Sequence, residues 1–257
     1  MRLRKMKPSL KNKFWLAAEW PAPVHVHAGT TTRLEGCSKP PYDSFNLAVH
    51  VGDENDCVYQ NRGLLRRLLQ LPSEPYWLDQ SHSGDAIKID GASSSNHADA
   101  AYTRKPGMIC TVLTADCVPI LICNHEGTEV AAIHAGWKGL CRNIVQNALA
   151  CFGSAPDQLM AWIGPHISSD YYEVRDDVRN ACIDSLSESM AVAFKQTNTG
   201  SWLADLGLIA RLILAKAGVQ EIHASKFCTY REKEYFYSYR RKNITGRMAS
   251  LIWIEEN

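Results

Sequence analysis

The sequence predicts an α+β fold in which mixed, largely antiparallel β-sheets are flanked by helices. Strand candidates outnumber helix candidates along the chain, and several are linked as hairpins, which argues against a doubly wound parallel sheet. The 257 residues contain no internal repeat and no low-complexity linker. We therefore expect a single domain over residues 14–257, preceded by a basic, solvated tail at residues 1–13.

The N-terminal part begins with a strand and a long Gly/Pro-rich loop within residues 24–50. A helix is predicted over residues 54–70, because apolar side chains recur there on one face and a Leu-Pro-Ser-Glu-Pro segment ends it. Residues 76–82 are a strand candidate, and residues 85–90 alternate between polar and apolar side chains as a half-buried strand does.

The centre of the chain is rich in β-formers. Residues 108–117 and 118–124 are predicted strands, and the turn His125–Gly127 separates the second from another strand at residues 128–135, which indicates a hairpin. A helix is expected next, because apolar residues recur at helical spacing until Gly153. These residues are Leu140, Ile144, Val145, Ala148, Leu149 and Phe152.

The C-terminal part alternates between strands and helices. Residues 159–164 are a predicted strand, and helices are expected at about residues 175–188 and 205–217. The second helix has Asp205 as its predicted N-cap and Gly218 just past its end.

The chain is predicted to close with a hairpin. Its two strands would be Glu-Tyr-Phe-Tyr-Ser-Tyr-Arg-Arg at residues 234–241 and Met-Ala-Ser-Leu-Ile-Trp-Ile-Glu at residues 248–255. The turn between them would be Asn-Ile-Thr-Gly at residues 243–246.

Charge and hydropathy exclude some classes of function. The tail carries six basic residues and no acid; without it the chain has 22 basic and 27 acidic side chains, a net charge of −5. A body of that sign matches a nucleic-acid backbone poorly, so nucleic acid is not an expected partner. No run of 18 apolar residues occurs, so no membrane-spanning helix is expected. The basic residues of the tail are Arg2, Arg4, Lys5, Lys7, Lys11 and Lys13.

Nine cysteines without a secretory signal indicate reduced thiols and a cytoplasmic protein. No Cys-x-x-Cys pair is present, so a zinc finger or ribbon is not supported. The sequence gives no signal for an oligomer, and a monomer is favoured.

One group of residues suggests a catalytic metal site. His134 ends one predicted strand, Cys117 follows another, and His82 lies where a strand enters a Ser/Gly-rich loop. One thiolate and two imidazoles are a legitimate zinc set, with a fourth position open to water, as in catalytic rather than structural sites. Zinc-bound water is acidic enough to attack at neutral pH.

Two neighbours of these candidates carry further chemistry. Asp116 could orient a histidine ligand or move a proton, although an extended backbone would point Asp116 and Cys117 to opposite faces, so that only a turn lets both serve one site. Lys138, at a predicted helix start, suggests an anion site. From spacing alone other interpretations stay open, because Cys117 could be a core residue, a metal-free nucleophile with a histidine base, or a ligand of a purely structural zinc.

Several motifs, in order, resemble the YfiH-type laccase-domain family, whose members have been called polyphenol oxidases and purine nucleoside enzymes. They are TTRLEGCSKPPYDSFNLAVHVGDE, TADCVPILICN, EVAAIHAGWKGL, CTYREKEYFYSYRR and TGRMASLIW, and the resemblance runs from about residue 30 to residue 253. It implies a catalytic α+β domain and a zinc ion, or copper, bound by His82, Cys117 and His134.

The resemblance also implies an activity. Phosphorolysis of adenosine, inosine and methylthioadenosine to the base and (methylthio)ribose 1-phosphate is expected, with adenosine deamination as a second activity. Phosphate and ribose then need binding groups, for which we select Arg33, Asn46, Lys138 and Arg240, with Asp116 joining the three ligands as a catalytic candidate. Arg241 and Arg247 are further cations to test.

One departure from the family concerns the loop of the first ligand, which usually reads Gln-Val-His-Gly. Here it reads Gln-Ser-His-Ser, with Ser81 and Ser83 beside His82. Serine tolerates a positive φ less well than glycine does, so we expect an altered loop backbone. A copper-dependent polyphenol oxidase is the main rival function, but a multicopper centre needs many histidines and the chain has a single His-x-His pair, His25 and His27.

Overall fold

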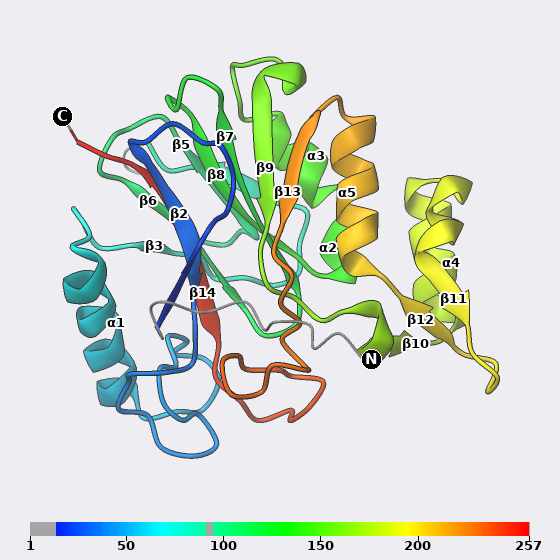
Figure 1. The fold of residues 1–257 in the computed structure, drawn as a ribbon, viewed down its shortest axis with the longest axis horizontal. Helices are drawn as coiled ribbons and strands as arrows, with labels where there is room; N and C mark the ends of the chain where they lie inside the picture. Colours follow the sequence, from blue (N-terminus) through cyan, green and yellow to red (C-terminus); the bar gives the residue numbers. More distant parts are fainter. Residues whose placement is uncertain (1–13, 91–94, 257) are drawn as a thin grey trace, which may run out of the picture.

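The computed structural model describes residues 14–90 and 95–256, so the predicted basic tail at residues 1–13 lies outside the described residues. Two large β-sheets lie face to face at the centre, and helices cover their outer faces (Figure 1). This confirms the predicted α+β class with mixed sheets. No helix within the described ranges is long and apolar enough to cross a membrane.

The first large sheet has the strand order β1-β2-β14-β6-β3. All of its pairs are antiparallel except that of β3 with β6. Its strands are β1 (Trp15–Ala17), β2 (Val26–Thr31), β3 (Tyr76–Trp77), β6 (Ile109–Thr114) and β14 (Met248–Ile254).

The second large sheet has the order β13-β9-β7-β8-β5-β4, with parallel pairs only at its two edges. Its strands are β4 (Ala86–Lys88), β5 (Ala100–Thr103), β7 (Val118–Asn124), β8 (Val130–Ala135), β9 (Leu159–Ile163) and β13 (Glu221–Ala224). A small third sheet has the order β10-β12-β11. It consists of β10 (Glu173–Val174), β11 (Phe194–Gln196) and β12 (Trp202–Ala204).

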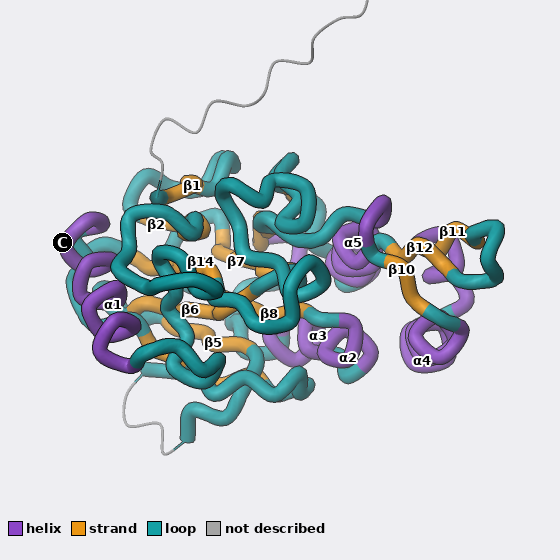
Figure 2. Tube along the Cα trace, turned by 90° about the horizontal axis from the view of Figure 1, so that it is seen from below, coloured by secondary structure: helices purple, strands orange, loops and turns teal. Residues whose placement is uncertain are grey.

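The helices flank the pair of large sheets on opposite sides, except for one that packs against the small sheet. They are α1 (Asn55–Leu69), α2 (Trp137–Cys141), α3 (Ile144–Leu149), α4 (Asp176–Leu186) and α5 (Leu206–Lys216), with short 3₁₀ turns η1 (Pro156–Gln158), η2 (Ser169–Tyr171) and η3 (Glu188–Ala193). Helix α1 packs on the first sheet, and α2, α3 and α5 pack on the second. Figure 2 shows α1 at one end of the molecule and α4, with the small sheet, at the other.

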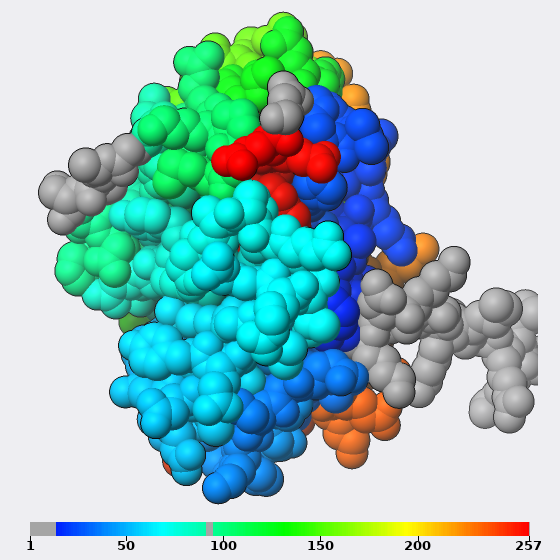
Figure 3. All heavy atoms as spheres, turned by 90° about the vertical axis from the view of Figure 1, so that its left-hand side faces the viewer, coloured from blue at the N-terminus to red at the C-terminus, as the bar shows by residue number. Residues whose placement is uncertain are grey.

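Burial follows from these layers. Strands β7 and β8 are buried along their whole length, because one face meets the first sheet and the other meets the helices. Strands covered on both faces read as continuous apolar runs, which is how they appear in the sequence. The surface on the α1 side, seen in Figure 3, is formed in its lower half by this helix and the segment before it, coloured blue to cyan.

Several predicted elements are confirmed. Helix α1 spans residues 55–69 of the predicted 54–70, and β7 and β8 pair antiparallel across the predicted turn. Helix α5 begins where expected, since the Asp205 carboxylate accepts a hydrogen bond from the backbone N–H of Leu208 at 2.8 Å, and it ends before Gly218 at φ +100°.

Two predictions about elements were wrong. The helix expected after residue 140 is broken into α2 and α3, because Asn143 adopts a left-handed backbone at φ 61°. The closing hairpin does not form, since residues 234–241 are not a strand. Strand β14 already pairs with β2 on one edge and β6 on the other, so it has no free edge for a third strand.

Candidate metal centre

The structure brings the three predicted ligands together. Cys117 lies in the tight connection between β6 and β7, His134 lies in β8 beside it, and His82 is supplied by the loop after β3. Their ligand atoms all lie within 4.8 Å of one another, and Cys117 Sγ is 3.7 Å from His82 Nε2. Tetrahedral zinc with ordinary bond lengths would separate a sulfur and a nitrogen ligand by about 3.6 Å. The donor set therefore fits zinc in both chemistry and spacing.

Gly136 leaves room for this approach. A Cβ at this position would lie 2.8 Å from His82 Cδ2 and 3.0 Å from Cys117 Sγ. Any other residue would therefore push the ligands apart. The glycine that directly precedes α2 is thus part of the geometry of the site, beyond its role at the helix start.

The turn required for Asp116 and Cys117 to serve one site is present. Asp116 has a left-handed backbone at φ 96°. Its buried carboxylate accepts hydrogen bonds from Thr229 Oγ1 at 2.6 Å, Ser238 Oγ at 2.9 Å and the backbone N–H of Arg240 at 2.7 Å. It contacts neither histidine ligand by a hydrogen bond, so the prediction that it orients one of them is not supported. Instead it ties the segment that carries Arg240 to the site.

The histidine ligands are tied to a different carboxylate, that of Asp99, which sequence reasoning missed. His134 Nδ1 lies 2.7 Å from Asp99 Oδ1, and the backbone N–H groups of Ser81, His82 and Ser83 also donate to this carboxylate. Asp99 is fully buried. No pattern in the sequence indicated this contact, because the residues involved belong to segments that are distant along the chain.

The charges of the metal-free site are set by its own members. Burial raises the pKa of the Cys117 thiol, but His134 and His82 outweigh it and the pKa falls to about 6. Burial lowers the pKa of His134, but Cys117 and Asp99 outweigh it and raise the pKa to about 9. The lowered pKa of Cys117 favours its thiolate, which is the form that binds metal.

The three ligands lie on the wall of a cavity of about 510 Å³. Its wall combines polar strand ends with cationic and aromatic side chains: His50, Gln80, His82, Leu113, Thr114, Ala115, Asp116, Cys117, His134, Trp137, Lys138, Tyr172, Tyr239, Arg240 and Arg247. Cavities of about 300–1,000 Å³ bind small organic molecules. A ligand the size of a nucleoside with phosphate fits this range.

The predicted substrate contacts divide into two groups. Lys138 and Arg240 line the cavity, as does Arg247. Arg33 and Asn46 do not line the cavity, and their side chains contact other residues instead. The Arg33 guanidinium pairs with Asp43 at 2.9 Å, and the buried Asn46 Oδ1 accepts a hydrogen bond from the backbone N–H of Arg247 at 3.0 Å.

Other pocket residues were not singled out from sequence. Tyr172 and Tyr239 provide aromatic faces, and each lies beside an arginine: Arg240 is 4.7 Å from the ring centre of Tyr172, and Arg247 is 5.8 Å from that of Tyr239. His50 also lines the wall, where burial and the adjacent Arg247 lower its pKa. Their role depends on which loops meet at the cavity, a property that no local motif reports.

The chain matches a family model described as multi-copper polyphenol oxidoreductase laccase over residues 27–255. The chain belongs to this family. The curated relatives include the purine nucleoside phosphorylases YfiH of Shigella flexneri and of Escherichia coli strain K12. Each is 45% identical over 240 residues, which cover 93% of this chain and 98% of the relative.

Solved structures share this fold over nearly the whole chain. A crystal structure of a Neisseria meningitidis protein has a TM-score of 0.89 and 41% identity, covering 95% of this chain and all of that one. The crystal structure of YlmD from Geobacillus stearothermophilus has a TM-score of 0.90 and 30% identity, with 96% of this chain and 98% of that one covered.

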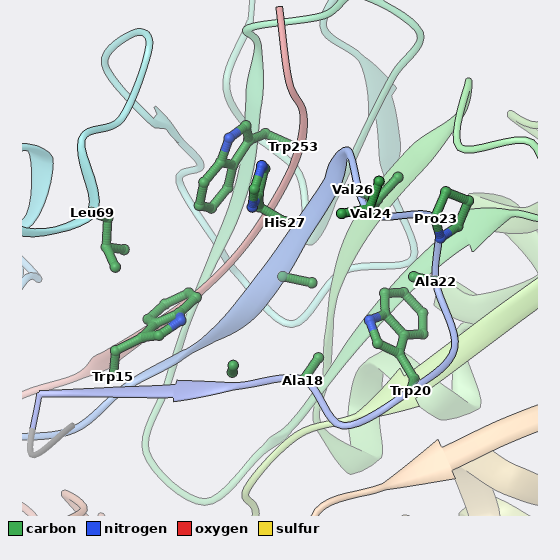
Figure 4. A pocket seen from close by; sticks show the side chains of 12 residues that line it. Trp15, Ala18, Trp20, Ala22, Pro23, Val24, Val26, His27, Leu69 and Trp253 are labelled. Atoms are coloured by element: carbon green, nitrogen blue, oxygen red, sulfur yellow. The ribbon is translucent and has the colours of Figure 1, made fainter. Parts of the chain in front are cut away.

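The name of the laccase family raises the question of further metal sites. In residues 14–90 and 95–256, the one group with ligand atoms close enough together for a metal ion is His82, Cys117 and His134. The His-x-His pair does not join it: His27 stacks on Trp253 at 5.0 Å and lies 3.3 Å from Glu255. This ring lines a separate hollow of about 320 Å³ with Trp15 (Figure 4).

The loop around His82 differs from the expectation that Ser83 would need a positive φ. The residue with a positive φ is His82 itself, at 59°, and Ser83 is not in the left-handed region. Serine at position 83 therefore meets no steric penalty there. Its backbone N–H makes the shortest of the three loop contacts with Asp99, at 2.6 Å.

Proposed function

We propose that this chain is a zinc-dependent purine nucleoside phosphorylase that cleaves adenosine, inosine and methylthioadenosine to the base and (methylthio)ribose 1-phosphate. The observation that carries the proposal is a three-ligand site on the wall of a cavity that also presents cations and aromatic rings. The proposal is supported by relatives named purine nucleoside phosphorylase, which this chain matches over almost their whole length.

The cations of the cavity would bind phosphate. Lys138, Arg240 and Arg247 lie on its wall, and phosphorolysis needs positive charge where the phosphate oxygens lie. Arg240 is held in place by a hydrogen bond from its guanidinium to the carbonyl of Glu173 at 2.8 Å and by the Asp116 carboxylate on its backbone N–H. A prearranged guanidinium loses less rotamer freedom when it binds an anion.

The aromatic side chains would bind the purine base. Tyr172, Tyr239 and Trp137 line the same cavity. Stacking on an aromatic ring tolerates different bases, because every purine offers a flat face. This would allow the proposed substrate range, which includes adenine and hypoxanthine nucleosides.

His82, Cys117 and His134 would hold the zinc ion, with a fourth position left for substrate or water. Zinc in such a site supplies Lewis acidity, which stabilises negative charge developing on an oxygen atom. Asp116 lies on the same wall, and because its oxygens already accept three hydrogen bonds, it would act by positioning the segment of Arg240. Adenosine deamination is proposed as a side activity of the same pocket.

The test is a paired measurement of metal content and turnover. Wild type and Cys117→Ala are analysed for bound metal, and adenosine with phosphate is followed by chromatography. The proposal expects about one zinc per chain with adenine and ribose 1-phosphate formed, and both lost in the variant. A zinc-loaded wild type that leaves adenosine intact would refute the proposed activity while leaving the metal site standing.

A metal-free cysteine hydrolase is a second candidate, favoured by the lowered pKa of Cys117 beside a histidine. It predicts activity that resists chelators and is abolished by alkylating reagents. A copper-dependent polyphenol oxidase, suggested by the name of the family, predicts oxygen uptake with a phenol in the copper-loaded protein alone. A purely structural zinc predicts that chelation unfolds the chain, whereas a catalytic site loses activity before structure.

A further inference from the structure

The Asp99 carboxylate is the point at which the supports of both histidine ligands meet. Asp99 immediately precedes β5 and is fully buried. Four donors converge on its two oxygens: His134 Nδ1 at 2.7 Å, and the backbone N–H groups of Ser81 at 3.2 Å, His82 at 3.1 Å and Ser83 at 2.6 Å. The side chain of Asp99 therefore links the loop that carries His82 to the strand that carries His134.

Its contact with His134 fixes which ring nitrogen faces the metal position. A carboxylate oxygen 2.7 Å from Nδ1 requires a proton on that nitrogen, so Nε2 is left with its lone pair free in the neutral ring. A second contact fixes the strand, since the backbone N–H of His134 donates to the Asp99 carbonyl at 2.8 Å. His134 is thus held by Asp99 at two points, its backbone N–H and its ring nitrogen Nδ1.

Its contact with the loop holds His82 in a conformation that it would otherwise avoid. His82 has φ 59°, in the left-handed region that non-glycine residues rarely adopt. Three consecutive N–H groups pointing at one anion form a concave nest around it. Without the anion these three donors would lose their common acceptor, and the loop would lose the contact that opposes relaxation of His82.

We propose that Asp99 is a positioning residue that assembles the metal site, by presenting the His134 and His82 rings to the same point. The inference rests on the proposed function only in taking His82, Cys117 and His134 as ligands. It assigns Asp99 no contact with the metal or with substrate, since both of its oxygens are already occupied by the four donors.

Glu129 offers a matched control. It is also a buried carboxylate, and it accepts hydrogen bonds from Tyr102 and from the backbone N–H groups of Gly153 and Ser154. It has no hydrogen bond with either histidine ligand. Glu129→Gln therefore reproduces the loss of a buried, multiply bonded charge without touching the supports of the metal site.

The experiment measures the zinc affinity of wild type, Asp99→Asn and Glu129→Gln by competition with a chromophoric chelator, alongside urea unfolding of each variant. The expected result is a 10- to 100-fold loss of affinity in Asp99→Asn and a change of less than about twofold in Glu129→Gln. Cobalt absorption spectra should show an altered ligand field in Asp99→Asn alone. A folded Asp99→Asn with wild-type affinity and spectrum would overturn the inference.

Asp99→Glu covers the case in which Asp99→Asn does not fold. It keeps the charge but displaces the oxygens by a methylene, so the inference expects weakened zinc binding, and unchanged binding would overturn it. Turnover is measured separately on wild type. A wild type that binds zinc but leaves nucleosides intact refutes the proposed function and not the role of Asp99, which is judged on affinity alone.

Discussion

Asp116 is the residue at which a structural role and a catalytic role can be separated most clearly. Asp116→Asn keeps the size of the side chain and removes its charge. Ser238 and the backbone of Arg240 both donate to Oδ2, and an amide oxygen at that position still accepts both bonds. The Thr229 hydroxyl can rotate to accept from the amide nitrogen. Asparagine also tolerates the left-handed backbone found here.

The expected cost of Asp116→Asn is therefore smaller than that of removing the side chain. All three charge-assisted hydrogen bonds become neutral ones, at about 1 kcal/mol each, so the free energy of unfolding should fall by about 3 kcal/mol. Asp116→Ala leaves three buried donors without an acceptor and adds backbone strain, for a loss of about 4–6 kcal/mol. That approaches the whole stability of an ordinary domain.

Urea unfolding of the two variants, with turnover of adenosine measured in parallel, decides the matter. An alanine variant within about 1 kcal/mol of wild type would refute the claim that this carboxylate holds the segment of Arg240. An asparagine variant that stays folded but loses turnover more than 100-fold would instead make Asp116 a proton-transfer group.

Three further outcomes are expected. After chelation of metal, the rate of alkylation of Cys117, measured by peptide mass spectrometry, should show an inflection near pH 6 instead of near pH 9. The reason is that the pKa of Cys117 is lowered, so the thiolate persists as the pH falls to about 6. An inflection near pH 9 would contradict the assigned environment. Zinc at 100 times its Kd should stabilise the chain by about 2.7 kcal/mol, a rise in Tm of roughly 5–10 °C, and Cys117→Ala should abolish this shift in scanning calorimetry. Arg240→Ala should raise the KM for phosphate about 10- to 100-fold, measured by titrating phosphate at saturating adenosine, and an unchanged KM would remove Arg240 from the phosphate site.

The parts of the fold that were predicted correctly are those set by local chemistry. The Asp205 cap, the glycine after α5 and the turn between β7 and β8 each depend on residues within a few positions of one another. The prediction of a closing hairpin was wrong because segments distant in the sequence compete to pair with the same strand. The aromatic pattern at residues 234–241 suits a strand, but β2 and β6 occupy both edges of β14.

The same distinction holds for the site. His82, Cys117 and His134 lie in motifs with recognisable chemistry, and the structure brings them together. Asp99 acts through a loop 16 to 18 residues earlier in the sequence and a histidine 35 residues later, so no short pattern reveals it. Arg33 lies in a motif too, yet its guanidinium is engaged by Asp43, and Arg33 does not line the cavity.

The residues that line the cavity lie on elements that are packed to different degrees. His134 lies on a strand enclosed by layers on both faces, and its surroundings tolerate little change in volume. Tyr172 directly precedes β10, in the small sheet that Figure 2 places with α4 at the edge of the molecule. The side chain proposed to bind the base and those proposed to bind zinc thus lie on different elements. If Tyr172 binds the base as proposed, a library randomised around it is expected to change which nucleosides are accepted while His82, Cys117, His134 and Asp99 stay intact.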